Sequence, residues 1–160
     1  MEHGPKKSVD EFATGPFRPH GRIEIWAEGN VVRLDAAGPF NKEAIVAMGA
    51  TWRALFDGMP ADGPFADLVT VHRSVMASQE VVDAFGGFLA ANTAARQAPS
   101  AVAWVVDPEV EGASLMLPKF AAVYVAAGRN FRFFDNEPEA EAWVREQLRG
   151  LPQRPPGGGH

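Results

Sequence analysis

Residues 101–106 form an unbroken apolar run, Ala-Val-Ala-Trp-Val-Val, between turn residues that include Pro99 and Pro108. A run of this length is too short for a free-standing helix. It is typical of a strand covered on both faces, as in a parallel sheet flanked by helices. We therefore expect a central strand here, within a series of alternating strands and helices.

Four further segments have the pattern of strands. Residues 23–27 and 31–36 alternate between apolar and polar on either side of a Glu-Gly-Asn turn, which predicts an antiparallel hairpin. Largely apolar segments at 65–71 and 130–134 predict two more strands. Together with the central strand, these segments give five expected strands.

Apolar residues at steps of three and four predict helices between the strands. Asn41, Ser78 and Asn136 precede three of these helices, where their side chains can accept a free amide hydrogen of the first turn. Residues 108–127 form a further helical region, in which Pro118 either causes a kink or opens a new helix, because proline lacks the amide donor and clashes with the preceding turn. The expected apolar faces consist of Ile45, Met48, Trp52, Leu55 and Phe56, then Val81, Val82, Phe85, Phe88, Leu89 and Asn92, then Ala140, Trp143, Val144 and Leu148.

The element order is therefore ββαβαβαβα. It predicts an α/β fold with a mostly parallel five-stranded sheet, an antiparallel edge strand and about four helices distributed over both faces. Glycine and proline are frequent at both ends, so we interpret residues 1–21 as a flexible leader, 22–150 as the folded domain and 151–160 as a flexible tail. Gly86-Gly87 lies inside the second helix, where we expect it to allow the close approach of a neighbouring element.

Composition limits the possible functions. The 160 residues include no cysteine, which excludes disulfides, thiolate metal sites and a cysteine nucleophile. The formal net charge is −5 and no basic run exceeds Lys6-Lys7, so we expect no nucleic-acid partner. No segment reaches about 18 consecutive apolar residues, and no apolar segment follows Lys6-Lys7 as in a secretory signal. We expect no membrane span and, by elimination, a cytoplasmic location.

Ligands of open α/β sheets bind outside the carboxyl ends of the parallel strands. We expect that edge to collect His72, Arg73 and Asp107, with Ser78 at a nearby helix start, and we take these four residues as a candidate binding edge. His72 and Asp107 could form a base and its orienting carboxylate, with Ser74 or Ser78 as nucleophile. However, the Gly-x-Ser-x-Gly motif is absent, and Asp107 before a proline is better explained as a helix cap. We predict no catalytic residue, and a hydrolase-type enzyme using His72 and Asp107 is only a second alternative.

Neither a metal nor a cofactor is indicated. Of the four histidines, at positions 3, 20, 72 and 160, none are paired at the spacing of metal ligands. The phosphate-binding patterns G-x-G-x-x-G and G-x-x-x-x-G-K-[ST] are both absent. We therefore predict no metal site and no cofactor.

Residues 116–127 are apolar nearly all round, more so than a helix with one wet face. Three explanations remain open for this helix, which we place at 113–127. It could be covered by a second chain in a homodimer, by the N-terminal leader, or by an apolar ligand in a cavity beneath it. We rank the homodimer first. The candidate contact residues for a second chain or a ligand are Met116, Phe120, Val123 and Tyr124.

The element order and the segment RFFDNEPEAEAWVREQL at 132–148 resemble the SpoIIAA-like group of the STAS superfamily. These small bacterial proteins share a fold with anti-sigma-factor antagonists and with lipid-transfer domains of the CRAL-TRIO type. The resemblance covers about residues 22–150. It is sharpest at 131–148, where a strand ending in Phe-Asp leads into a helix with Ala and Trp on its inner face.

The sequence departs from the antagonists at their Asp-Ser-Ser-Gly phosphorylation motif. The corresponding stretch, residues 77–80, is Ala-Ser-Gln-Glu and retains one serine only. Glu80 would oppose a phosphate on Ser78, so we favour a plain helix cap there. Our leading hypothesis is a non-enzymatic binding or regulatory module with this fold that acts through protein–protein contact. The first alternative is a protein that binds a small apolar ligand or a lipid, as the resemblance to lipid-transfer domains implies.

Overall fold

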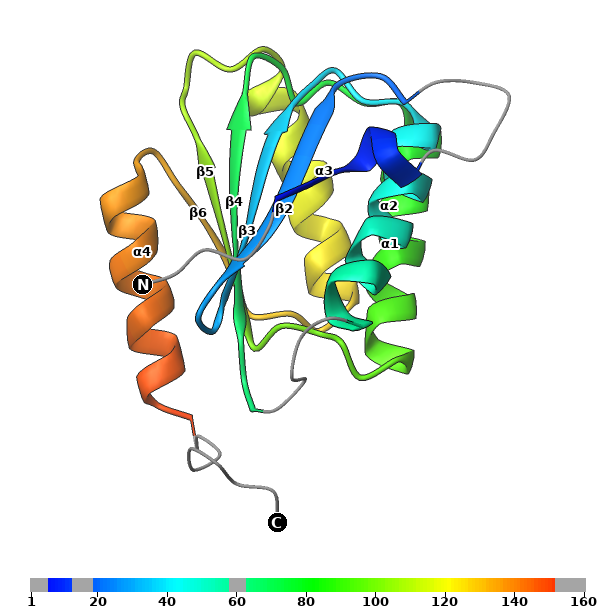
Figure 1. Cartoon of the computed structure of the whole chain (residues 1–160). Coiled ribbons are helices and arrows are strands. Elements are labelled where there is room, and N and C mark those ends of the chain that lie inside the picture. The colour runs from blue at the N-terminus through cyan, green and yellow to red at the C-terminus, as the bar shows by residue number, and fades with distance from the viewer. Residues whose placement is uncertain (1–5, 13–18, 58–62, 152–160) are drawn as a thin grey trace.

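The computed structural model of the chain describes residues 6–12, 19–57 and 63–151. Figure 1 shows one twisted sheet, with α1, α2 and α3 on one face and α4 on the other. The strands are β1 (Lys7–Ser8), β2 (Arg22–Glu28), β3 (Val31–Ala37), β4 (Ala66–His72), β5 (Ala101–Val106) and β6 (Phe131–Phe134). The helices are the 3-10 helix η1 (Val9–Phe12), α1 (Lys42–Asp57), α2 (Gln79–Ala94), α3 (Ala113–Ala126) and α4 (Glu137–Arg149).

The strands lie side by side in chain order, from β1 to β6. Strand β2 is antiparallel to β1 and β3, and the strands from β3 to β6 are parallel. The expected α/β fold, mostly parallel with an antiparallel edge, is confirmed. Because the strand order never reverses, right-handed crossovers through α1, α2 and α3 all fall on the same face. Helix α4 follows the last strand and covers the opposite face.

The sheet has one strand more than the five expected. Lys7 and Ser8 pair with Ile25 and Glu24 of β2, and a strand of two residues is too short to show any periodicity in the sequence. Val9, in η1, is fully buried, and η1 packs against α1. Residues 7–12 of the expected leader are therefore part of the fold. The predictions for residues 1–5, 13–18 and 152–160 lie outside the described residues.

The central strand β5 is buried along its whole length, as its sequence predicts. Its side chains alternate between two cores. Val102, Trp104 and Val106 face α1–α3, whereas Ala101, Ala103 and Val105 face α4. The alanines leave space for α4 to lie close to the sheet.

The helix starts confirm three predicted caps. Asn41 accepts a hydrogen bond from the Ala44 amide at 3.0 Å, and Asn136 accepts one from the Glu139 amide at 3.0 Å. Ser78 accepts one from the Val81 amide at 3.3 Å. The expected apolar faces of α1, α2 and α4 are confirmed as well, and Phe88 and Trp143 are half-buried members of these faces.

Helix α3 starts at Ala113 and ends at Ala126, close to the predicted bounds of 113–127, and it includes Pro118. In the wider helical region predicted at 108–127, residues 108–112 form turns, a bend and an isolated bridge, so no helix starts at Pro108 or Pro118. Gly112 precedes it with φ +80°, and a Cβ at this position would lie 2.4 Å from the Met76 sulfur. Pro118 lies inside the helix on its exposed side, where the loss of one amide donor affects the solvent-facing turn.

The prediction for Gly86-Gly87 is wrong. A Cβ at Gly87 would have no heavy atom within 4 Å, and at Gly86 the nearest would be Val123 Cγ1 at 3.7 Å, an ordinary contact. Neither glycine is required by the approach of a neighbouring element. Their small size instead leaves open space along the outer side of α2.

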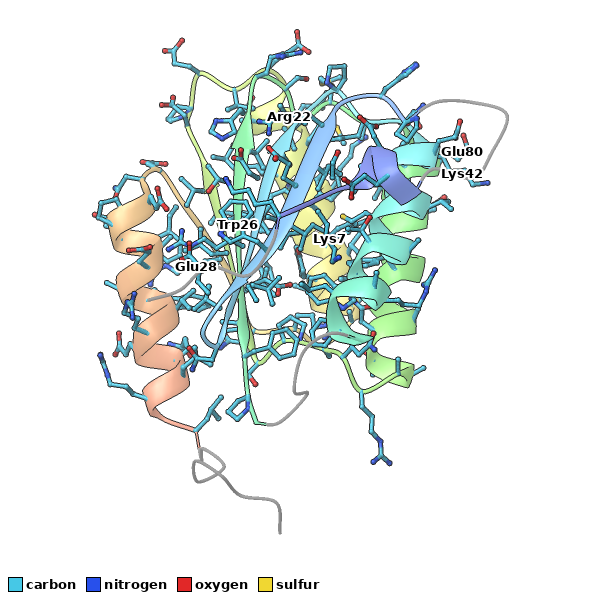
Figure 2. The ribbon with its side chains drawn as sticks, in the orientation of Figure 1. Lys7, Arg22, Trp26, Glu28, Lys42 and Glu80 are labelled. Atoms are coloured by element: carbon cyan, nitrogen blue, oxygen red, sulfur yellow. The ribbon has the colours of Figure 1, made fainter. Side chains whose placement is uncertain are left out.

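Helix α4 is held to the sheet by charged groups as well as by its apolar face. Arg33 of β3 contacts Glu28 and Glu137, both at 2.6 Å, and also Glu141. Burial would lower the pKa of Arg33, but hydrogen bonds to Glu141 and Glu28 outweigh it, so the pKa is raised. The guanidinium is therefore fully charged and joins the hairpin to α4. Figure 2 labels Glu28 and the neighbouring Trp26, whose indole N–H donates to Glu28 at 3.0 Å.

Candidate functional site

The carboxyl edge of the sheet places His72 beside Asp35, with 2.5 Å between Nε2 and Oδ1. Asp35 belongs to β3 and also accepts a hydrogen bond from Arg22 at 3.2 Å. The His72 side chain is 51% exposed, so the pair is a surface contact. The uninterrupted strand order creates no switch point, which is where the ligand crevice of an open α/β sheet forms.

Asp107 is not paired with His72. Its Oδ1 accepts a hydrogen bond from the Glu109 amide at 2.8 Å, in the turn that follows β5. Asp107 thus caps a turn, and the N-cap of α3 is Gly112. The sequence analysis placed the carboxylate that follows β5, Asp107, beside His72. The carboxylate that contacts His72 instead comes from β3, on the other side of β4.

Arg73 and Ser74 join two loops at this edge. Arg73 is exposed, has φ +67°, and its carbonyl accepts a hydrogen bond from the Glu111 amide at 3.0 Å. Ser74 is buried, and its hydroxyl donates to the Glu111 carboxylate at 2.8 Å. The hydroxyl of Ser74 is therefore held by an acid, and the structure does not bring it to the histidine.

Ser78 is exposed at the start of α2, where it acts as the cap described above. The adjacent Glu80 forms an ion pair with Lys42 of α1, with 3.6 Å between nitrogen and oxygen. Figure 2 shows the two side chains at the same end of the neighbouring helices α1 and α2. The candidate binding edge thus consists of surface ion pairs, loop contacts and a helix cap.

Helix α3 turns most of its predicted contact residues inward. Met116, Phe120 and Tyr124 are buried beneath the helix, and Val123 is half-buried. The outward face carries other apolar residues, with Leu115 56% exposed and Val125 68% exposed. Because the helix is apolar all round, its sequence could not show which side faces the sheet.

The described part of the leader does not cover α3. Element η1 packs against α1 and β2, and β1 pairs with β2 at the far edge of the sheet. Of the three explanations for the apolar helix, cover by the leader therefore receives no support from residues 6–12. Cover by a second chain or a ligand beneath the helix stays a prediction.

An open groove runs between α2 and α3 beside this outward face. Small side chains and glycine make up much of its floor, and Asp83 is the charged residue on its wall. The lining residues are Val82, Asp83, Gly86, Ala90, Thr93, Val123, Ala126 and Ala127. Small residues allow another polypeptide to approach the helix backbones closely.

A cavity of about 60 Å³ lies between the sheet and helices α1–α3. Apart from Asp67, its lining is almost entirely aliphatic or aromatic. The lining residues are Ile23, Leu34, Ala36, Phe40, Ile45, Met48, Asp67, Val69, Val71, Val75, Phe85, Phe88, Leu89, Trp104, Phe120 and Tyr124. The cavity thus lies beneath α3, where the sequence predicts an apolar ligand space as one alternative.

Asp67, the second residue of β4, is 8% exposed, and its Oδ1 has no hydrogen-bond partner among the described residues. Burial raises the pKa of Asp67 well above its ordinary value, although the positive charge of Arg129 acts in the opposite direction. Arg129 donates to the Leu89 carbonyl at 2.7 Å and to the Thr93 hydroxyl at 3.0 Å.

Tyr124 and Trp104 form the remaining polar contact near this group. The Trp104 indole N–H donates to the Tyr124 hydroxyl at 2.8 Å, and burial raises the pKa of Tyr124. Sequence reasoning missed Asp67. The available signal was a lone acid within the apolar run Phe65-Ala-Asp-Leu-Val69, at a position whose neighbours on both sides belong to a buried strand.

No group of three or more His, Asp or Glu side chains within 6–12, 19–57 and 63–151 is placed to hold a metal ion. In the same part of the chain, no helix has the length and apolar character needed to cross a membrane.

Comparison with solved structures identifies the fold. The chain is similar to an uncharacterized protein from the DUF3478 family with a SpoIIAA-like fold, from Shewanella loihica PV-4. The two share 14% sequence identity with a TM-score of 0.53, and the match covers 82% of this chain and 98% of the other. The fold is SpoIIAA-like. No protein-family model and no curated protein matches the sequence.

Proposed function

We propose that this SpoIIAA-like protein is a non-enzymatic binding module that acts through protein–protein contact. Its docking surface is the outward face of α3 with the α2–α3 groove, and the occupant is a second copy of the chain. The observation that carries the proposal is the exposure of Leu115 and Val125 on one side of a single helix. Large exposed apolar groups that share a face favour burial by a partner.

The groove extends this surface to a second helix. Helix α3 has 14 residues and is therefore about 21 Å long, so its outward stripe is too small for the roughly 800 Å² that each chain buries in a stable complex. The small side chains at Gly86, Ala90 and Ala126 allow a helix of the other chain to pack against both α2 and α3.

The charges on this surface favour a second copy over an unrelated partner. Lys119 is exposed on α3 and forms no ion pair with a described residue, and Asp83 lies on the groove wall. In a twofold dimer the same surface of both chains forms the interface, so each contact between two different residues occurs twice. A surface that carries one positive and one negative charge can therefore pair these charges with those of its own copy.

The carboxyl edge supports the non-enzymatic part of the proposal. The Ser74 hydroxyl donates to Glu111 while His72 contacts Asp35, so these described residues do not align a nucleophile with a base.

The volume of the cavity beneath α3 bears on the lipid alternative. This volume of about 60 Å³ is far below the roughly 300 Å³ at which pockets for larger ligands begin. This difference supports a small ligand over a lipid.

Native mass spectrometry and sedimentation of the purified chain test the proposal. We expect a dimer whose population grows with concentration. Val125→Glu places a charge in the interface and raises the dissociation constant about tenfold or more. Val46→Glu is the matched control, because Val46 is 55% exposed on α1, away from the groove, and its substitution leaves the dimer intact. A monomer at every concentration, or equal effects of the two variants, contradicts the proposal.

A further inference from the structure

The cavity beneath α3 contains a hydrogen-bond acceptor that the protein leaves unused. Asp67 Oδ1 is buried, lines the cavity and has no partner among the described residues. Buried carboxylates are ordinarily hydrogen-bonded, because burial removes the water molecules that would bond to them and another donor must take their place. A donor that enters the cavity would therefore stabilise this position.

None of the neighbouring donors reaches Asp67 Oδ1, although Arg129 Nε is also buried without a partner among the described residues. Arg129 directs Nη2 to Leu89 and Thr93, and the Trp104 indole donates to Tyr124. The charge of Arg129 acts on Asp67 through space, but the two side chains form no ion pair. An occupant with an N–H or O–H group would satisfy Asp67 without displacing any of these contacts.

The size and lining of the cavity define the rest of the occupant. One water-sized position needs about 10–15 Å³, so a cavity of about 60 Å³ holds roughly four to six non-hydrogen atoms. Phe85, Trp104 and Phe120 line it with aromatic rings, whose faces attract cations and whose edges pack against alkyl groups. Asp67 supplies the acceptor, and a cation bound beside it favours the ionised carboxylate over the protonated form that burial favours.

We propose that this cavity binds a short-chain primary amine in its protonated form, with the ammonium group donating to Asp67 and the alkyl chain among the aromatic rings. An alcohol of the same length would satisfy the acceptor but would add no positive charge to favour its ionised form. A carboxylic acid would place a second acid beside the first. A quaternary ammonium ion would bring charge but no N–H donor.

This site is separate from the proposed dimer surface. It uses the inner side of α3, through Phe120 and Tyr124, whereas the docking surface uses Leu115 and Val125 on the outer side. A monomeric protein that binds the amine would therefore contradict the dimer proposal alone. A dimer that does not bind the amine would contradict the amine proposal alone.

The first test titrates the full-length chain with n-butylamine, n-butanol and butyrate at pH 8, where an alkylammonium group is still protonated. Calorimetry gives the affinity, and the NMR signal of the Trp104 indole N–H reports whether the ligand enters the cavity. We expect saturable binding of the amine, about tenfold or more tighter than that of the alcohol. Equal affinities for the amine and alcohol, or no saturation and no shift of the indole signal, overturn the proposal.

A pair of variants then tests the role of the carboxylate. Asp67→Asn keeps the shape of the side chain and removes its charge, and we expect it to weaken amine binding about tenfold or more. Asp135→Asn removes an exposed carboxylate from the turn between β6 and α4, outside both proposed sites, and leaves binding unchanged. Equal losses in both variants would show nonspecific attraction to acidic groups. If Asp67→Asn does not fold, the three-ligand comparison on the unmodified chain still decides.

Discussion

The two faces of the sheet are packed in different ways. On the α4 face, small residues of β4 and β5 meet the apolar stripe of α4, and Arg33 joins β3 to the acids of that helix. On the other face, three helices cover a larger core that is rich in aromatic rings and contains a cavity. The first face is closed by close packing and by paired charges.

The polar groups show the same difference. Trp52 Nε1, Asp67 Oδ1 and Arg129 Nε are buried on the three-helix side without a hydrogen-bond partner among the described residues, and a fourth such atom, Gln97 Oε1, lies in the loop after α2. On the α4 side, the guanidinium of Arg33 reaches three carboxylates. Unpartnered groups inside a folded core reduce stability, so their concentration on one face points to a use other than stability.

The largest expected difference between the faces comes from their tryptophans. Trp104 is buried on the three-helix side, where it contacts Phe120 and Tyr124, whereas Trp143 is half-buried on α4. Trp104→Ala should lower the free energy of unfolding by about 3–5 kcal/mol through lost burial and a new cavity. Trp143→Ala, the matched control, should lower it by less than about half of that.

Chemical denaturation followed by circular dichroism measures both variants. Equal losses for Trp104→Ala and Trp143→Ala would show that the two faces contribute alike. Trp104→Phe adds a finer test, because it keeps a ring but removes the indole donor to Tyr124. It should destabilise the protein by about 1–3 kcal/mol, since the buried hydroxyl loses its partner.

The second prediction concerns the charged contacts of the α4 face. The Arg33 side chain is 14% exposed, and Arg33→Met leaves Glu28, Glu137 and Glu141 without their shared cation. We expect a loss of about 1–3 kcal/mol in the free energy of unfolding. Arg22→Met is the control, because Arg22 is 47% exposed and its ion pairs with Glu24 and Asp35 lie on the surface, where a pair contributes about 0–1 kcal/mol.

Thermal unfolding at low and high salt measures this pair of variants. The difference between them should persist at high salt, because partly buried charges are screened less than exposed ones. If Arg33→Met is as harmless as Arg22→Met, the α4 face is held by its apolar contacts alone.

Much of the fold could be predicted because local patterns determine it. The alternation of residues 23–27 and 31–36 gave the hairpin, the unbroken run at 101–106 gave the central strand, and Asn41 and Asn136 marked helix starts. Each of these signals arises from residues that are close in sequence. The predicted SpoIIAA-like fold is confirmed by the similarity to the solved structure of the Shewanella loihica protein, which has that fold.

The features that sequence reasoning missed depend on contacts between distant segments. Strand β1 has two residues and exists only because β2 offers it an edge. The partner of His72 depends on the strand order, and the buried side of α3 depends on how an apolar helix rotates against the sheet. Asp67 lacks a hydrogen-bond partner only in the assembled core, and a lone acid in a strand does not reveal this alone.

The smallest expected effect, taken over one pH unit, is a pH dependence that separates Asp67 from the other carboxyl groups. Burial raises its pKa in the folded protein above the value of 3.8 that it has in the unfolded chain. Between these two pKa values the folded state binds more protons than the unfolded state, so the contribution of Asp67 to stability falls as the pH rises. Its slope is at most about 1.4 kcal/mol per pH unit.

Asp67→Asn removes this contribution and leaves the other titrating groups in place. The free energy of unfolding of the unmodified chain, minus that of the variant, should therefore fall as the pH rises from about 4 upward, and level off once folded Asp67 is ionised. Denaturation curves at matched pH values measure the difference. A difference that stays constant with pH would show that Asp67 ionises alike in both states. A difference that rises with pH would show that its folded pKa is lowered, as for a carboxylate that has found a donor, and the contrast between the two faces would then disappear.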